Sequence, residues 1–191
     1  MYKRQEVLKK CILTKGINVD ELPTFDIEYL FLNIRSKSIG EDIKITVTCP
    51  DDNETKVPVT IYVDEIKVVR QKDHSTDIRL DDKMTLRMKY PSLNQFIETN
   101  FETGDGSETV VEKTFKVVAN CMDTIFTGED AWEAKDYTPS ERMDFVEQLN
   151  SSQYKKVENF FSTMPKLSHT IEVVNPNTKK KGTVGLEGLA D

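Results

Sequence analysis

The chain offers few side chains whose type and spacing could carry out acid–base or nucleophilic chemistry. Its two histidines, His74 and His169, stand far apart, and neither has a Cys, Ser or Asp at a spacing typical of a catalytic triad or a metal site. The pair Asp81-Asp82 could act as two acids, but neighbouring aspartates between two strands are typical of a hairpin turn. The sequence therefore predicts no catalytic residue and a protein that is not an enzyme.

A glycine-containing segment, Gly104-Asp105-Gly106-Ser107, has some features of a phosphate-binding loop. It lacks the lysine, the preceding strand and the following helix with which such a loop holds phosphates. We interpret it as the tip of a surface loop, and we predict no cofactor site in the chain.

The three cysteines, Cys11, Cys49 and Cys121, have no close spacing and are expected to be reduced thiols. Cys49 opens the run Cys49-Pro50-Asp51-Asp52-Asn53 between two predicted strands, which has the outline of a zinc-ribbon knuckle. The run Asn175-Pro176-Asn177-Thr178 has a similar outline. A structural zinc site needs four Cys or His ligands, and these two turns supply one thiol. We therefore predict no metal, and the sequence leaves open a degenerate zinc-ribbon-like hairpin without metal.

Composition and charge argue against two classes of partner. The 191 residues are 37% hydrophobic and 31% charged, which indicates a soluble globular protein. No apolar run approaches the ~18 residues that a membrane span needs. A net charge of -7 argues against nucleic-acid binding through bulk electrostatics, and we interpret Lys179-Lys180-Lys181 as a solvated turn.

The stretch from Phe25 to Val63 predicts a helix followed by a hairpin, around which the other elements are organised. The helix carries two apolar stripes at helical spacing, with Ile27, Leu30, Phe31 and Ile34 on one and Phe25, Tyr29 and Leu32 on the other. Gly40 supplies the expected helix end. The second stripe is either a binding surface for a partner or is covered within the chain by a helix predicted around residues 7–12.

The whole pattern predicts an α+β fold of mostly antiparallel β-hairpins with packed helices. We expect a second hairpin at residues 78–90, a capping box at Ser92 and Gln95, a helix at 110–125, a helical hairpin at 139–164 and a terminal strand–turn–strand unit at 168–189. Three regions follow: residues 1–90 hold the helix pair and the antiparallel β region, residues 91–164 are helical, and residues 165–191 form a C-terminal β-hairpin that docks on the rest. A first helix that begins at about Tyr2 without a capping residue ahead of it also suggests a further segment upstream.

Three runs of the sequence resemble a known family. They are FDIEYLFLNIRSKSIGEDI at residues 25–43, PSLNQF at 91–96 and FFSTMPKLSHTIEVVNPNTKKKGTVGLEGLAD at 160–191. They resemble the baseplate hub assembly proteins of T4-like tailed bacteriophages, and residues 25–43 are the most specific part. The resemblance implies a non-enzymatic protein, made late in infection, that acts in the host cell cytoplasm as an assembly chaperone for the central hub of the tail baseplate.

The resemblance also implies partners. Other phage baseplate hub proteins are expected to bind the chain, and self-association is left open. The expected partner-binding residues are Phe25, Tyr29 and Leu32 on the second helical stripe, and Val184, Leu186 and Leu189 on the terminal hairpin. Two alternatives stay open: a permanent structural subunit of the baseplate hub in the virion, and a cell-wall hydrolase.

Overall fold

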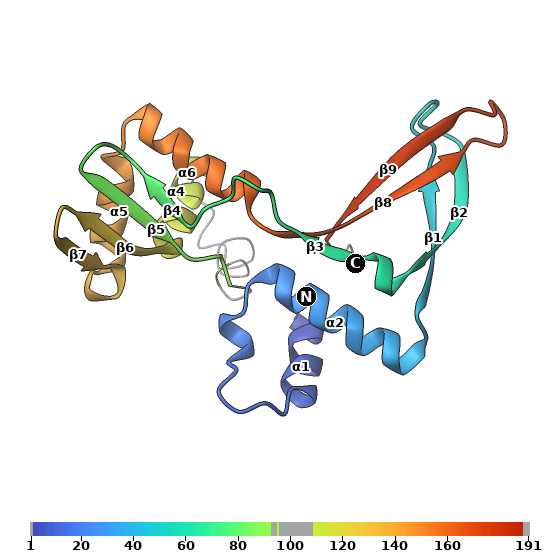
Figure 1. The fold of residues 1–191 in the computed structure, drawn as a ribbon, viewed down its shortest axis with the longest axis horizontal. Helices are drawn as coiled ribbons and strands as arrows, with labels where there is room; N and C mark the ends of the chain where they lie inside the picture. Colours follow the sequence, from blue (N-terminus) through green and yellow to red (C-terminus); the bar gives the residue numbers. More distant parts are fainter. Residues whose placement is uncertain (1, 93–94, 96–108, 189–191) are drawn as a thin grey trace. The chain divides into compact units, whose positions relative to one another are not determined.

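The computed structural model describes residues 2–92, 95 and 109–188 (Figure 1). The chain divides into one unit of Met1–Val19, Phe25–Val69 and Pro165–Asp191 and another of Asp20–Thr24 and Arg70–Met164. These boundaries differ from the predicted divisions after residues 90 and 164. The C-terminal hairpin belongs with the first hairpin, against which its apolar side chains pack, and residues 70–90 belong with the predicted helical region, because residues 84–88 pair with residues 122–127. The predicted α+β class is confirmed.

Two helices stand at the start of the first unit. They are α1 (Tyr2–Cys11) and α2 (Thr24–Ile39), and short 3-10 turns lie at Val19–Glu21 and Val63–Glu65. Helix α2 ends as predicted, because Gly40 has φ +116° and its N–H donates to the carbonyl of Ser36 at 3.1 Å. A side chain would be strained at this φ, so glycine is the residue that suits the helix end.

Two hairpins from distant parts of the sequence pack together in the first unit. Strands β1 (Asp42–Thr48) and β2 (Lys56–Tyr62) form an antiparallel pair, and β3 (Lys67–Val69), β8 (Lys166–Val174) and β9 (Lys181–Glu187) form a sheet in the order β3-β8-β9. Their apolar faces meet in a core that includes Val47, Ile61, Ile171 and Val173. The predicted first and terminal hairpins are therefore confirmed, and Figure 1 shows them running alongside each other.

The second unit is a four-stranded antiparallel sheet packed with helices. Its strands β4 (Asp77–Arg79), β5 (Met84–Met88), β6 (Met122–Thr127) and β7 (Asp130–Glu133) follow the order β4-β5-β6-β7. The helices are α4 (Val110–Cys121), α5 (Pro139–Glu147) and α6 (Ser151–Thr163), and a 3-10 turn lies at Ala134–Asp136. The core combines both kinds of element, and its buried members include Leu86, Met88, Val118, Met122, Val146, Val157 and Phe160.

The prediction of one helix over residues 110–125 is wrong, and the region at 91–164 that was predicted to be helical also contains strands β6 and β7. Helix α4 ends at Cys121, and the next residue begins strand β6, which pairs with β5 through Leu86 and Ile125. Gly128, with φ +64°, then lies at the turn into β7. The chain becomes a strand here because β5 offers an unpaired edge, and a tertiary partner of this kind overrides local helical periodicity.

The predicted helix starts are confirmed in detail. Thr138 and Glu141 form a reciprocal capping box with Pro139 at the first helical position, and Ser92 and Gln95 exchange the same pair of bonds. The predicted surface loop at residues 104–107 lies outside the described residues. Across the residues that are described, no helix combines the length and the apolar character needed to cross a membrane.

Candidate functional site

The two turns that were compared with zinc knuckles share one backbone hydrogen bond and one left-handed residue. In the first, the N–H of Asn53 donates to the carbonyl of Cys49 at 3.0 Å, and Asn53 has φ +54°. In the second, the N–H of Lys179 donates to the carbonyl of Asn175 at 2.9 Å, and Lys179 has φ +61°. Each turn therefore begins with a residue followed by proline and reverses at a left-handed residue four positions later.

Side-chain hydrogen bonds join these turns. Asn175 is only 1% exposed, and its Nδ2 donates to Asp51 Oδ1 at 2.9 Å and to Asp52 Oδ2 at 2.8 Å. Its Oδ1 accepts from the backbone N–H of Asn177 at 2.9 Å and of Thr178 at 3.3 Å. The amide thus uses both donors and both acceptor positions, which a buried asparagine needs. We call Asp51, Asp52, Asn175 and Thr178 the turn clasp.

The clasp favours ionised aspartates. The hydroxyl of Thr178 donates to Asp51, and this bond, followed by the bond from Asn175, lowers the pKa of Asp51. The hydroxyl of Thr55 and the backbone N–H groups of Glu54 and Thr55 lower the pKa of Asp52 strongly. Both carboxylates are ionised at neutral pH and accept hydrogen bonds from the second turn. A hydrogen bond to a charged acceptor is stronger than one between neutral groups.

The clasp also depends on a close approach of the two hairpins. A Cβ added at Gly182 in β9 would lie 2.5 Å from Cγ and 2.9 Å from Cδ of Pro50, so no larger residue fits there without movement. Cys49 is buried beside the clasp, and its burial raises the pKa of the thiol. Within the described residues, no group of three or more His, Cys, Asp or Glu side chains is placed to hold a metal ion. The bonds of Asn175 and Thr178 to the two aspartates join the turns.

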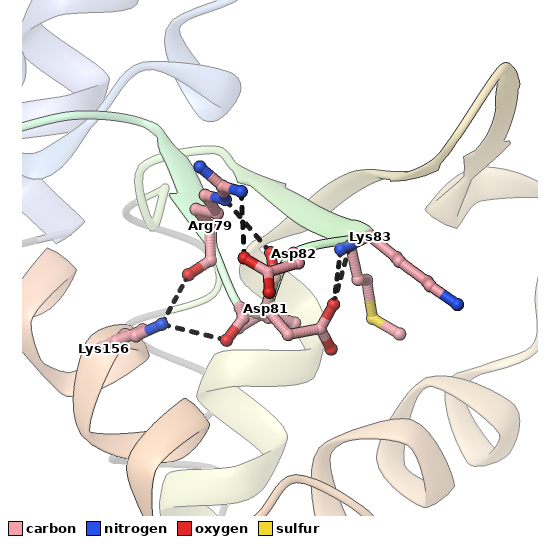
Figure 2. Close-up of polar contacts among 7 residues, drawn as sticks. Arg79, Asp81, Asp82, Lys83 and Lys156 are labelled. Carbon is pink, nitrogen blue, oxygen red and sulfur yellow. Dashed lines mark hydrogen bonds and ion pairs between the residues drawn. The ribbon is translucent and has the colours of Figure 1, made fainter.

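The pair Asp81-Asp82 lies in the turn between β4 and β5 (Figure 2). Asp81 Oδ1 accepts from the backbone N–H of Lys83 at 2.8 Å and of Met84 at 2.9 Å, and the bond from Lys83 is the main cause that lowers the pKa of Asp81. Asp82 Oδ1 accepts from Arg79 Nη2 at 3.1 Å, and both side chains are exposed. The turn is tied to α6 because Lys156 Nζ donates to the carbonyls of Arg79 and Leu80, each at 2.9 Å. This is the bonding of a hairpin turn.

His74 is buried in the core of the second unit and is fully hydrogen-bonded. Its Nδ1 lies 2.9 Å from Thr163 Oγ1, and its Nε2 lies 2.9 Å from the hydroxyl of Tyr90. Because Thr163 donates its own proton to the carbonyl of Asn159 at 2.6 Å, we assign the N–H to Nδ1 and the acceptor to Nε2. The ring also packs against Phe160 at 5.3 Å between centroids. A neutral imidazole satisfies every partner here, and burial lowers the pKa of His74.

This environment predicts that stability falls as the pH is lowered through the range of His74. Below about pH 6.5 the unfolded chain binds a proton that the folded chain takes up less readily, so protonation favours the unfolded state. Above that pH the contribution of the neutral imidazole to the free energy of unfolding is fully present. One such proton gives a slope of at most about 1.4 kcal/mol per pH unit. Urea unfolding of the wild-type chain and His74→Gln from pH 7 to pH 5 should show a steeper loss for the wild type. Equal slopes would contradict this prediction.

The predicted partner-binding residues on α2 differ in how far they are exposed. On α2, Tyr29 is 40% exposed, whereas Phe25 is 9% exposed and Leu32 is 1% exposed. Leu32 packs against Val63 of the 3-10 turn and Leu167 of β8, so the second stripe is covered within the chain at this position. Partner binding by the stripe stays a prediction, and Tyr29 is the residue through which it can act in the folded chain.

The terminal hairpin shows a similar division. Val184 and Leu186 are half-buried against the core formed with the first hairpin, so their side chains point into the unit, and Leu189 lies outside the described residues. The free edge of β9 is therefore accessible through its backbone rather than through these apolar side chains. The second histidine of the chain, His169, lies in β8, and its Nε2 is 3.8 Å from Glu65 Oε2.

Two surface features were missed by the sequence reasoning. Trp132 on β7 is 48% exposed and lines a cavity of about 290 Å³ with Ile125, Tyr137 and Phe145. An apolar groove of about 720 Å³ lies along α4 and α6 and is lined in part by Val117 and Phe161. The signal for the first was the Asp-Ala-Trp-Glu alternation after Gly128, which predicts a strand once residues 122–127 are recognised as one.

The comparison with known families now assigns the chain to a class. A family model described as "T4 bacteriophage base plate protein" matches residues 4–191, which is nearly the whole sequence. The chain therefore belongs to the family of T4 bacteriophage base plate proteins, and the predicted resemblance is confirmed at this level. No curated protein and no solved structure matches it.

Proposed function

We propose that the chain is a non-enzymatic tail assembly protein that helps to build the central hub of the baseplate by binding other hub proteins. In this role it acts as an assembly chaperone in the host cell cytoplasm. The observation that carries the proposal is the family match over residues 4–191. A protein that assists assembly needs surfaces for partners rather than a reactive centre.

The bonding of the polar side chains supports a role without catalysis. Asp81 accepts two turn amides, His74 is enclosed by Thr163 and Tyr90, and the aspartates of the turn clasp bind Asn175. Groups held in this way stabilise the fold, and they make their hydrogen bonds within the chain rather than to a substrate. We expect no cleavage of purified peptidoglycan by the chain, and hydrolysis that is lost in Asp81→Asn/Asp82→Asn would contradict the proposal.

Exposed aromatic and apolar side chains of the first unit supply candidate contact surfaces. Tyr29 on α2 is 40% exposed, and Tyr62 on β2 and Val174 on β8 are each 52% exposed. Tyrosine is enriched at protein interfaces because one end of the ring is apolar and the other is polar. These residues support binding of a protein partner.

The close alternative is a permanent structural subunit of the virion baseplate, which the family's description as a base plate protein favours. Quantitative mass spectrometry of purified virions and of complexes captured from infected cells separates the two roles. For a chaperone, we expect the chain bound to baseplate hub proteins in infected cells and scarce in virions. A constant ratio to known baseplate proteins in virions would establish the structural role, and absence of any baseplate protein from the captured complexes would contradict both.

A further inference from the structure

Strand β9 carries an unpaired edge. The strand order β3-β8-β9 places it at one side of its sheet, and no other strand in the described parts of the chain pairs with its second edge (Figure 1). Such an edge presents a row of N–H and C=O groups that an added strand can use.

The backbone groups at this edge can be assigned from the ladder with β8. The N–H of Gly188 donates to the carbonyl of Leu167, and the N–H of Asn175 donates to the carbonyl of Lys180, both at 2.9 Å. Hydrogen-bonded pairs alternate along an antiparallel ladder, so the even-numbered residues of β9 face β8. The backbone N–H and C=O groups of Lys181, Thr183, Gly185 and Glu187 therefore point to the free edge.

The sequence of β9, KGTVGLE, is complementary to itself when it is read antiparallel about Val184. Lys181 then stands opposite Glu187, Thr183 opposite Gly185 and Gly182 opposite Leu186. Each charge meets its opposite, Thr183 and Leu186 each meet a glycine, Val184 meets its own copy, and the outward backbone groups of residues 183 and 185 face each other. A shift by two residues in either direction loses the Lys–Glu pairs.

We propose that β9 pairs in antiparallel register with β9 of a second copy of this chain, which makes one continuous sheet across a two-fold axis. Lys166 Nζ donates to Glu187 Oε1 at 2.7 Å, and the Glu187 side chain is still 60% exposed, so a second lysine can reach it. Such an interface is isologous, so each chain contributes the same strand.

The other hairpin of the first unit is protected against the same pairing. Strand β2 has Pro58 at its centre, which has no N–H to donate, and β1 carries the exposed Lys44 within the strand. Proline and lysine within an edge strand are devices that block edge-to-edge association. Strand β9 has no proline, and its charges stand only at its two ends.

Sedimentation equilibrium of the full chain over a wide concentration range tests the proposal. We expect the mass to rise from 21.9 kDa toward twice that value as the concentration increases. Thr183→Pro removes an outward N–H and leaves the ladder with β8 intact, so it should abolish the dimer. A far-ultraviolet circular dichroism melt shows whether this variant folds.

A charge exchange tests the register independently of the proline variant. Lys181→Glu places like charges opposite each other twice in the dimer and should weaken it about tenfold. Adding Glu187→Lys should restore most of the loss, which a general surface effect would not do. Lys44→Glu, which makes the same change of charge on β1, is the matched control and should leave the dimer unchanged. The mass of a single chain at the highest concentration would overturn the proposal. A dimer whose dissociation constant does not change with the charge exchange would also overturn it.

Discussion

Replacing Asn175 by alanine is expected to lower the free energy of unfolding of the first unit by about 3 kcal/mol, one of the largest effects of any single change in the chain. The side chain is 1% exposed and makes four hydrogen bonds, two of them to carboxylates. Its loss leaves Asp51 and Asp52 facing each other without the shared donor. Hydrogen exchange of the backbone amides in β1, β2, β8 and β9 should become faster, and urea unfolding should give the magnitude.

Asn175→Asp sharpens this prediction through its pH dependence. The change keeps the acceptor for the turn amides but replaces the donor with a third carboxylate beside Asp51 and Asp52. We expect it to destabilise at least as much as alanine at pH 7 and to recover part of the loss near pH 4, where the new carboxyl group can bind a proton and donate. An equal loss at both pH values would show that charge is not the cause.

Two controls test whether the side-chain hydrogen bonds of Asn175 hold the two turns together. Asn177→Ala changes an asparagine of the same turn whose Nδ2 makes a single exposed bond to Thr55 at 3.0 Å, so it should have little effect. Treatment of the wild-type chain with a chelator should leave its melting temperature unchanged. A fall in melting temperature with the chelator would mean that a metal joins the turns, and it would contradict the hydrogen-bonded clasp.

The clasp illustrates how far the sequence alone could lead. The similar outline of the two runs, each with proline at its second position, was visible in the sequence, and the shortage of thiols predicted no metal. What the sequence could not supply was the pairing of Asn175 with Asp51, because the two residues are 124 positions apart and their contact depends on how the hairpins pack. The left-handed residues, Asn53 and Lys179, were also not predicted, since glycine is the usual residue there.

The failure at residues 122–127 has a different cause. Val118, Met122 and Ile125 follow helical spacing, so periodicity continues through the point where α4 ends and β6 begins. The same residues also fit a strand, because Thr124, Ile125, Phe126 and Thr127 favour extended structure. The second edge of β5 decides between the two, and the sequence did not indicate that β5 needed a partner besides β4.

The sequence also left open whether the second stripe of α2 is covered within the chain or binds a partner, and one residue of this stripe gives the second large effect on stability. Leu32→Ala is expected to lower the free energy of unfolding by about 3 kcal/mol, because the side chain is 1% exposed and packs on Val63 and Leu167. Leu32 and Tyr29 belong to one predicted stripe, yet part of the cover comes from a strand that begins more than 130 residues later. No local pattern in α2 could reveal which stripe members that strand would bury.

Tyr29→Ser should behave in the opposite way. With 40% of Tyr29 exposed, we expect a loss of stability below about 1 kcal/mol and a clear loss of binding to baseplate hub proteins captured from infected cells. Tyr137→Ser is the matched control, since it removes a tyrosine of similar exposure, 36%, from the second unit and should leave binding by α2 intact. If Tyr29→Ser binds like the wild type while Leu32→Ala loses binding only in proportion to its unfolded fraction, α2 is a scaffold alone. The partner surface must then be sought elsewhere on the chain.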